Sequence, residues 1–169
     1  MLNFLKGKQL EIAAPLTGKV IPVTEVPDPV FAEKILGDGI AVDPTDGEVY
    51  SPVDGTVFQI AHTFHAMGIE SDDGLEILVH LGIDTVTLEG KGFRCFAEVG
   101  QKVKKGDKIM EMDIDFIKER GLSPVSPCVI TNLDAIKSLT VCPGPAEGGR
   151  TAAITYRRRA PHLPQELSP

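Results

Sequence analysis

The clearest hydrophobic pattern in the chain is a run at 76–81 with the sequence Glu-Ile-Leu-Val-His-Leu. Turn-forming residues enclose it, with Asp-Asp-Gly at 72–74 before the run and Gly82 after it. This composition predicts a buried β-strand. Because side chains alternate between the two faces of a strand, Leu78 and His80 are expected on one face and the remaining aliphatic residues on the other.

A second pattern is a local repeat. Ala-Pro-Leu-Thr-Gly-Lys-Val at 14–20 recurs as Ser-Pro-Val-Asp-Gly-Thr-Val at 51–57, so that Pro15 and Pro52 lie 37 residues apart. Each copy has proline at a strand edge and glycine in a tight turn, where its backbone freedom is needed. Repetition of a hairpin-like unit favours an all-β fold with an internal pseudo-repeat.

Helix is predicted in only two short stretches, 29–34 after Asp28 and 113–120, the second capped near Asp113 and ended by Gly121. One domain is expected over residues 1–156, because no composition change divides it. Residues 157–169 carry three consecutive arginines and three prolines and are predicted to form a flexible tail.

Composition narrows the function classes. The net charge of −7 argues against nucleic acid or an anionic membrane as the main partner, because phosphate groups select Lys- and Arg-rich surfaces. The three cysteines are odd in number and lack CxxC spacing, which indicates a reduced, intracellular protein. No apolar run approaches the roughly 20 residues that span a bilayer, and the first residues have no signal-peptide cleavage pattern. We therefore expect a cytoplasmic protein.

His80 is the first candidate for chemistry. Near neutral pH an imidazole can act both as a nucleophile and as a proton carrier, and a partly apolar surrounding would keep water from a phosphohistidine. A backbone carbonyl in the turn after His80 could accept a hydrogen bond from one ring nitrogen and leave the other nitrogen free to attack. On position alone, a hydrogen-bonded core histidine is the competing interpretation.

His65 strengthens the case for chemistry. If residues 63–65 are extended, Thr63 and His65 point the same way, and the threonine hydroxyl can orient the imidazole. The Asp-Asp-Gly turn at 72–74 predicts a hairpin that brings His65 beside His80. A second imidazole there could donate to phosphoryl oxygens as charge builds. Two histidines could also bind zinc, but no third ligand is evident.

At these residues the chain resembles the glucose-family enzyme IIA of the bacterial phosphoenolpyruvate-dependent sugar phosphotransferase system (PTS). The resemblance rests on residues 14–57, 62–93 and 126–134, on the G-x-x-V-x-x-G-D run from Gly100, and above all on His-Leu-Gly-Ile-Asp-Thr-Val at 80–86. It implies an antiparallel β-sandwich/barrel hybrid with few short helices.

The resemblance also implies a phosphotransferase with a phosphohistidine intermediate. His80 corresponds to the histidine phosphorylated on Nε2, His65 to its partner in passing phosphate onward, and Thr63 to the threonine that hydrogen-bonds that partner. The phosphoryl donor would be the phosphocarrier protein HPr, and the acceptor a cysteine of the sugar-specific IIB domain. Relatives can regulate transporters and kinases when unphosphorylated, and zinc can then lie between the two histidines and a partner's carboxylate.

The family docks its partners through an apolar disc with an acidic rim. Asp28 and Asp84 match rim carboxylates that would guide an arginine of HPr, although both can instead be turn or cap residues. The apolar positions of the disc include fewer aromatic residues than is usual for the family. Two of them, Val30 and Phe31, can equally belong to the core. The apolar positions are Val30, Phe31, Met67, Leu78 and Leu81.

Three other functions compete. A zinc hydrolase on a related fold needs an H-x-H pair, whereas His62 and His65 are spaced H-x-x-H. A lipoyl or biotinyl carrier, suggested by the run near Val99, needs a lysine at a hairpin tip, and the tip at 72–74 has none. A purely regulatory binding protein is compatible with the same surface. The sequence does not indicate which sugar is served.

Overall fold

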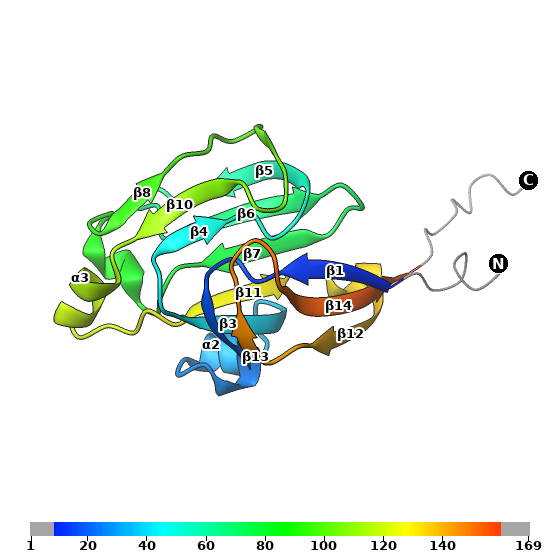
Figure 1. Ribbon diagram of the computed structural model, residues 1–169, viewed down its shortest axis with the longest axis horizontal. Coiled ribbons are helices and arrows are strands. Elements are labelled where there is room, and N and C mark those ends of the chain that lie inside the picture. Colours follow the sequence, from blue (N-terminus) through cyan, green and yellow to red (C-terminus); the bar gives the residue numbers. More distant parts are fainter. Residues whose placement is uncertain (1–8, 160–169) are drawn as a thin grey trace, which may run out of the picture.

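The computed structural model describes residues 9–159, which form antiparallel β-sheets and two short α-helices (Figure 1). The all-β prediction is confirmed. The helices are α2 (Pro29–Ala32) and α3 (Ile114–Glu119), with 3₁₀ turns at η1 (Val23–Glu25), η2 (Thr85–Leu88) and η3 (Leu133–Ala135). The strands are β1 (Gln9–Ala13), β2 (Gly18–Pro22), β3 (Asp38–Pro44), β4 (Glu48–Tyr50), β5 (Gly55–Ile60), β6 (Ala66–Ser71), β7 (Glu76–His80), β8 (Phe93–Cys95), β9 (Lys102–Val103), β10 (Lys108–Met112), β11 (Ser126–Ile130), β12 (Ile136–Val141), β13 (Gly144–Ala146) and β14 (Ala152–Arg158).

The order of the strands in the sheets has an approximate twofold symmetry. The large sheet runs β13-β2-β3-β11-β7-β6-β5-β9, and two small sheets run β1-β14-β12 and β4-β10-β8. The order therefore reads the same from either edge once β2-β3 is matched with β5-β6 and β1-β14 with β4-β10. A pseudo-twofold axis passes between the central strands β7 and β11, at the cross-strand pair Cys128 and Val79.

The sequence repeat is the visible trace of this symmetry. Ala13 donates its N–H to the carbonyl of Pro52 at 3.0 Å, and Tyr50 donates its N–H to the carbonyl of Pro15 at 2.8 Å. The two bonds are the same interaction made in opposite directions, since each donor and each acceptor is displaced by the repeat length. The two repeat copies and the residues just before them are therefore joined by reciprocal backbone hydrogen bonds.

The turn glycines of the two copies occupy equivalent positions, each close to the backbone of a neighbouring strand. Gly18 pairs with Pro44, and Gly55 pairs with Ser71. A Cβ atom on either glycine would lie 2.2 Å from a backbone carbonyl oxygen of the neighbouring strand. Only glycine allows the backbones to approach this closely.

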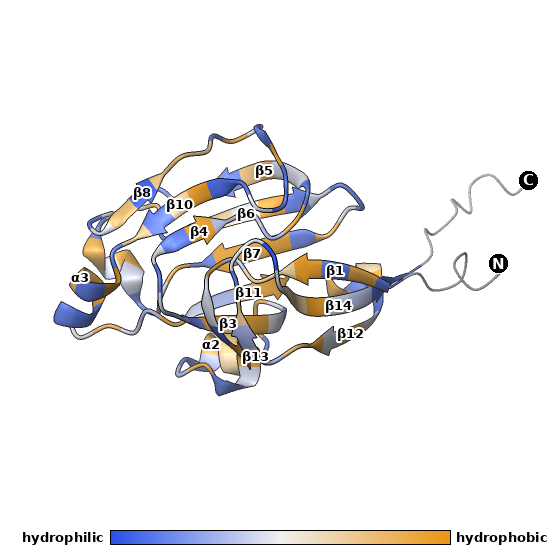
Figure 2. Cartoon of the chain, viewed as in Figure 1, coloured by the Kyte–Doolittle hydropathy of each residue, from blue (hydrophilic) through white to orange (hydrophobic). Residues whose placement is uncertain are grey.

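The core has two parts on opposite faces of the large sheet. The main cluster draws buried residues from all three sheets, and Figure 2 shows hydrophobic residues along β1, β14 and β7. A second cluster lies on the other face beneath η1 and α2. The two clusters take alternate residues of the central strands, as strand geometry requires. The buried residues of the second cluster are Val23, Val26, Phe31, Ala41, Ile83 and Val129.

The two predicted helices are confirmed with their caps. Asp28 accepts the N–H of Val30 at 2.8 Å and begins α2, and Asp113 accepts the N–H of Phe116 at 3.1 Å and begins α3. Gly121, with a φ of 76°, follows the end of α3 in the left-handed conformation that glycine tolerates. No helix among residues 9–159 is long and apolar enough to cross a membrane.

The predicted start of the flexible tail needs correction. β14 continues through Arg158 and pairs with both β1 and β12, and Arg159 still donates its N–H to the carbonyl of Ala135 at 2.9 Å. Arg157 and Arg158 therefore belong to the fold, because strand pairing on both sides holds them. The rest of the predicted tail lies outside the described residues.

Candidate active site

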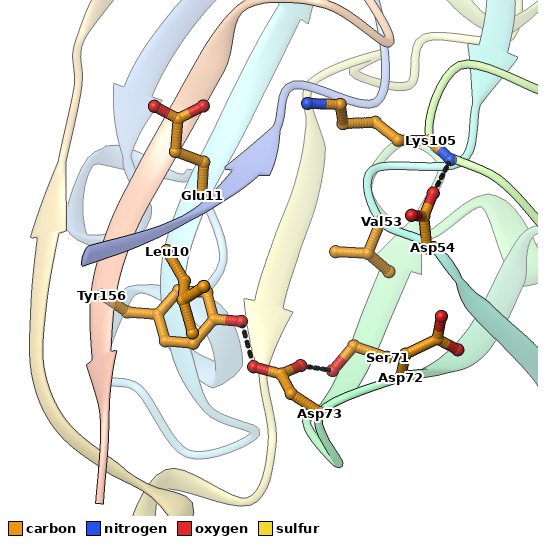
Figure 3. Close-up of a pocket in the computed structure, with 9 residues that line it drawn as sticks. All are labelled: Leu10, Glu11, Val53, Asp54, Ser71, Asp72, Asp73, Lys105 and Tyr156. Carbon is orange, nitrogen blue, oxygen red and sulfur yellow. Dashed lines mark hydrogen bonds between the residues drawn. The ribbon is translucent and has the colours of Figure 1, made fainter. Parts of the chain in front are cut away.

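The site is built on the β6–β7 hairpin, whose register pairs Ala66 with His80 and Glu70 with Glu76. The Asp-Asp-Gly turn closes the hairpin as predicted, with Gly74 at a φ of 92°. At this turn the hydroxyl of Tyr156 donates to Asp73 at 2.5 Å, and the hydroxyl of Ser71 donates to the same carboxylate (Figure 3). The hairpin is therefore anchored to β14 at one end and presents His80 at the other.

A cavity of about 250 Å³ lies beside this anchored turn (Figure 3). Its lining combines carboxylates, Lys105 and the ring of Tyr156, and it contains neither histidine. It lies at the opposite end of β7 from His80, so it is separate from the candidate active site.

The hairpin brings the two histidines together as predicted. Their ring centroids are 5.1 Å apart with an interplanar angle of 78°. The N–H of Leu81 donates to the carbonyl of His65 at 2.7 Å, which extends the strand pairing to the position of the second ring. The backbone of His65, in the connection just before β6, is thus held next to the end of β7 by a hydrogen bond.

His80 is oriented by the turn that follows it. Its Nδ1 lies 2.8 Å from the carbonyl oxygen of Gly82. A carbonyl can only accept, so Nδ1 carries the proton and Nε2 keeps its lone pair. Burial lowers the pKa of His80, partly offset by the Gly82 carbonyl and by the charges of Asp28 and Asp84, while nearby His65 lowers it further. The ring is consequently held neutral near pH 7, with the lone pair on Nε2.

His65 is oriented by Thr63, whose Oγ1 lies 2.6 Å from Nδ1 of the ring. The extended backbone considered for residues 63–65 is not what the structure has, because Phe64 has a φ of 58° and its N–H donates to the carbonyl of Ala61 in a turn. The turn nevertheless brings the hydroxyl to the imidazole, so the predicted contact is confirmed by a different backbone route. Burial lowers the pKa of His65 as well.

The apolar surface around the pair differs in part from the prediction. The ring of Phe31 packs against His80 with centroids 5.0 Å apart, Val30 is exposed on α2, and Leu78 is half-buried. Met67 and Leu81 were predicted to belong to this surface and do not, because they are 1% and 0% exposed. Both point into the main core, since strand alternation places them on the face opposite His80.

The two predicted rim carboxylates lie near His80, as their effect on its pKa shows. Asp28 combines this position with its role as the N-cap of α2. Asp84 is exposed and adopts the left-handed conformation, with a φ of 60°, just before η2. The cap and turn interpretations are therefore correct, and they coexist with an electrostatic effect on the site.

Sequence reasoning missed three exposed apolar side chains. Phe64 is 42% exposed next to His65, and Val86 is 54% exposed two residues after Asp84. Phe58 is 42% exposed and its ring lies over Gly68, where a Cβ would meet it at 2.7 Å. Gly68 pairs with Leu78, so Phe58 extends the apolar surface across the sheet. Phe64 could have been found from the sequence, because an aromatic residue in a turn beside a histidine is not explained by core packing.

The residues available for a metal are few. Within residues 9–159 no group of three or more His, Cys, Asp or Glu side chains is arranged to hold an ion. His65 and His80 could supply two nitrogen ligands, fewer than the usual tetrahedral set of a zinc site. A zinc ion at this pair would therefore need ligands from another molecule.

Comparisons with known proteins agree with this geometry. Residues 10–136 match the family model for the phosphoenolpyruvate-dependent sugar phosphotransferase system, EIIA 1. The glucose-specific EIIA component of the PTS from Bacillus cereus is 50% identical over 141 residues, covering 83% of this chain and 86% of the relative. The corresponding protein of Buchnera aphidicola is 45% identical over 153 residues, covering 90% and 95%.

Two further matches extend the comparison. A glucose-specific EIICBA component of Staphylococcus saprophyticus is 50% identical over 134 residues, which cover 79% of this chain but only 20% of that longer protein. The solved glucose permease IIA of Mycoplasma capricolum superposes with a TM-score of 0.81 at 39% identity, covering 87% of this chain and 96% of that one. The predicted sandwich architecture is thereby confirmed. The chain therefore belongs to the EIIA 1 family of the phosphoenolpyruvate-dependent sugar phosphotransferase system, which implies a part in phosphotransfer during sugar uptake.

Proposed function

We propose that the protein is a phosphocarrier in which His80 accepts a phosphoryl group from the phosphohistidine of HPr and passes it to a cysteine of a sugar-specific IIB domain. The observation that carries the proposal is the contact of His80 Nδ1 with the Gly82 carbonyl, beside the ring of His65. This arrangement leaves Nε2 as the free nucleophile.

The first step is an in-line transfer between two nitrogens. The Nε2 lone pair of His80 forms the new P–N bond while the donor's P–N bond breaks and its electron pair returns to the donor ring. Positive charge develops on the ring of His80, and the Gly82 carbonyl stabilises it through the proton on Nδ1. The lowered pKa of His80 keeps the lone pair available at neutral pH.

His65 has the complementary role. If the Thr63 hydroxyl donates to Nδ1, then Nε2 of His65 carries its proton and can donate to a phosphoryl oxygen. This donation strengthens as charge builds on the phosphoryl group during transfer to the IIB cysteine. Because burial lowers the pKa of His65, the ring acts as a neutral hydrogen-bond donor.

The apolar surroundings and the rim support docking of these partners. Phe31, Val30, Phe64 and Val86 can exclude water from the phosphoryl group. Asp28 and Asp84 provide negative charge for an arginine of HPr, which would speed encounter. The glucose-specific names of the relatives, one of them joined to permease domains, make a glucose permease the first acceptor to test.

Incubation with enzyme I, HPr and phosphoenolpyruvate should give one acid-labile, base-stable phosphate per chain. We expect His80→Gln to abolish labelling and His65→Gln to permit labelling but block transfer to IIB. His62→Gln is the matched control, since His62 is exposed in the same segment, and it should behave like the wild type. Labelling that survives in His80→Gln would overturn the assignment.

Regulation and zinc binding by the unphosphorylated protein stay predictions. A regulatory partner would use the same apolar surface, and zinc between His65 and His80 would need a carboxylate from that partner. Zinc-dependent binding of a transporter or kinase, lost in His65→Gln, would support both predictions together. Binding that does not respond to a zinc chelator would support the regulatory role and contradict the zinc site.

A further inference from the structure

The carbonyl that orients His80 belongs to a glycine whose two flanking peptide groups are both clamped. The N–H of Gly82 donates to the hydroxyl oxygen of Ser126 at 3.1 Å. The N–H of Ile83, which shares a peptide plane with the Gly82 carbonyl, donates to the carbonyl of Ser123 at 3.0 Å. The direction of the Gly82 carbonyl is therefore fixed from both sides.

Ser126 is the polar exception in an otherwise apolar strand. All five residues of β11 are buried, and Ser126 is 0% exposed. Its hydroxyl donates to the carbonyl of Pro124 at 2.8 Å, which leaves the oxygen lone pairs to accept from Gly82. Burying a hydroxyl is unfavourable unless it is hydrogen-bonded. The Ser126 hydroxyl meets this requirement by donating to the Pro124 carbonyl and accepting from the Gly82 turn.

Thr85 clamps the other side of the same turn. It is also 0% exposed, and its hydroxyl donates to the carbonyl of Leu81 at 2.6 Å. Its methyl carbon would lie 2.6 Å from a Cβ atom on Gly82, whose φ is 76°. The turn therefore requires glycine for two reasons, its left-handed backbone and the closeness of Thr85.

We propose that Ser126 and Thr85 are positioning residues for phosphoryl transfer. They hold the two edges of the Leu81–Gly82 peptide group, so that the Gly82 carbonyl that follows fixes the Nδ1-protonated form of His80. The proposal rests on the proposed function of His80. Neither hydroxyl contacts the ring, and each acts through the backbone of residues 81–83. The pair explains why two buried hydroxyl groups converge on one turn of the main core.

The test removes each hydroxyl and observes the His80 ring directly. Ser126→Ala and Thr85→Val delete the hydroxyls, and Thr85→Val keeps the methyl contact with Gly82. Ser51→Ala is the matched control, because Ser51 is also 0% exposed and its hydroxyl donates to a backbone carbonyl, that of Val53 at 2.7 Å, away from the histidines. Nitrogen-15 NMR of imidazole-labelled protein reports the protonated nitrogen and the pKa of both histidines.

We expect both variants to lose the single Nδ1-protonated form of His80 and to show a mixture, while His65 stays unchanged. The pKa of His80 should fall further, because the carbonyl hydrogen bond that raises it is weakened. Phosphoryl acceptance from HPr should slow by roughly tenfold, as expected for a weakened hydrogen bond to a charged ring. Ser51→Ala should alter neither the NMR signature nor the rate.

An unchanged His80 tautomer in a folded variant would overturn the proposal, as would an equal change in Ser51→Ala. If Ser126→Ala does not fold, Thr85→Val decides the question alone, because it preserves packing volume. The proposed function fails separately: phosphate on a residue other than His80 would remove it, whatever the tautomer result. Normal labelling of His80 with an unaltered tautomer would remove only the positioning role.

Discussion

The pseudo-twofold axis relates one half of the fold, which contains β2, β3 and β11, to a second half, which contains β5, β6 and β7. The two halves share a scaffold, but His65 and His80 both lie in the second. In the second half, Ala66 on β6 pairs with His80 on β7. In the first half, the corresponding pair is Gly39 on β3 with Val129 on β11. The correspondence follows from the turn glycines, since Gly18 pairs with Pro44 as Gly55 pairs with Ser71. Val129 thus occupies the place of His80, and Asp38 precedes Gly39 as His65 precedes Ala66.

The difference between the halves lies in one connection. The chain between β2 and β3 spans residues 23–37 and forms η1 and α2, whereas the chain between β5 and β6 spans only 61–65. The longer connection covers Val129, which is 1% exposed, and leaves His80 half-buried but accessible. It also places Phe31 against the ring of His80. The longer connection in one half thus packs against the His80 ring of the other half, and the difference between the halves shapes the site.

Phe31→Ala should have the largest effect, because it removes the residue that joins the inserted segment to both halves. Phe31 is 5% exposed, and truncation of a buried phenylalanine costs about 3–5 kcal/mol of unfolding free energy. Urea unfolding measures this loss. The variant should also accept phosphate more slowly at temperatures where it is folded. A loss below about 1 kcal/mol would mean that the segment does not depend on this side chain.

Gly18→Ala and Gly55→Ala test whether equivalent turn glycines contribute equally to the stability of the two halves. Each substitution forces a methyl group to within 2.2 Å of a neighbouring carbonyl oxygen. We expect both to lose roughly 2–3 kcal/mol of unfolding free energy, by the same overpacking. Clearly unequal losses, measured in the same urea titration, would show that the two halves share a backbone geometry but not the same contributions to the free energy of unfolding.

The pH dependence of stability should arise from the histidine-bearing half. Burial lowers the pKa of both His80 and His65 below the unfolded value of 6.5. Below about pH 6.5 the unfolded chain therefore binds more protons at these rings than the folded protein does. Their contribution is full above about pH 7, falls as the pH drops through 6.5, and is lost below the folded-state pKa values. Unfolding free energies measured from about pH 8 to about pH 5 should follow this course.

A double variant, His65→Gln with His80→Gln, serves as the control for the pH series. Its stability should decline less over the same interval, because no ring with a lowered pKa remains at the site. An identical decline in the wild type and the double variant would assign the effect to carboxylates elsewhere.

Phe58→Ala should have the smallest effect on stability, within about 0.5 kcal/mol, since its ring is 42% exposed over Gly68. Docking should be more sensitive. We expect the KM for phosphorylated HPr or for the IIB acceptor to rise several-fold with little change in kcat, as for a peripheral apolar contact. Unchanged KM values for both partners would exclude Phe58 from the docking surface.

Much of this site could be predicted from local sequence, because a hairpin fixes it. The turn at 72–74 predicts the hairpin that brings His65 close to His80. Strand alternation alone would place His65, which lies opposite Leu81, on the other face of the sheet, so the orientation of its ring depends also on the turn at Phe64. The same alternation assigns Leu81 to the core, and the pairing of Met67 with Val79 does so for that residue. Both were assigned to the surface only by resemblance. Contacts between distant segments, such as Phe31 with His80, depend on how the inserted segment folds back over the sheet, and no local pattern encodes that.

The anchoring of the hairpin turn to β14 has a consequence for covalent attachment. Gln9 at the start of β1 pairs with Arg157 near the end of β14, and Arg158 contacts the backbone of Asp73. Both strand ends therefore meet at the turn, and the length of β7 separates them from His80 by roughly 15–20 Å. A neighbouring domain could be joined at either strand end without shielding the histidines. The geometry is compatible with the glucose-specific EIICBA component of Staphylococcus saprophyticus, a longer protein of which the matched residues make up 20%.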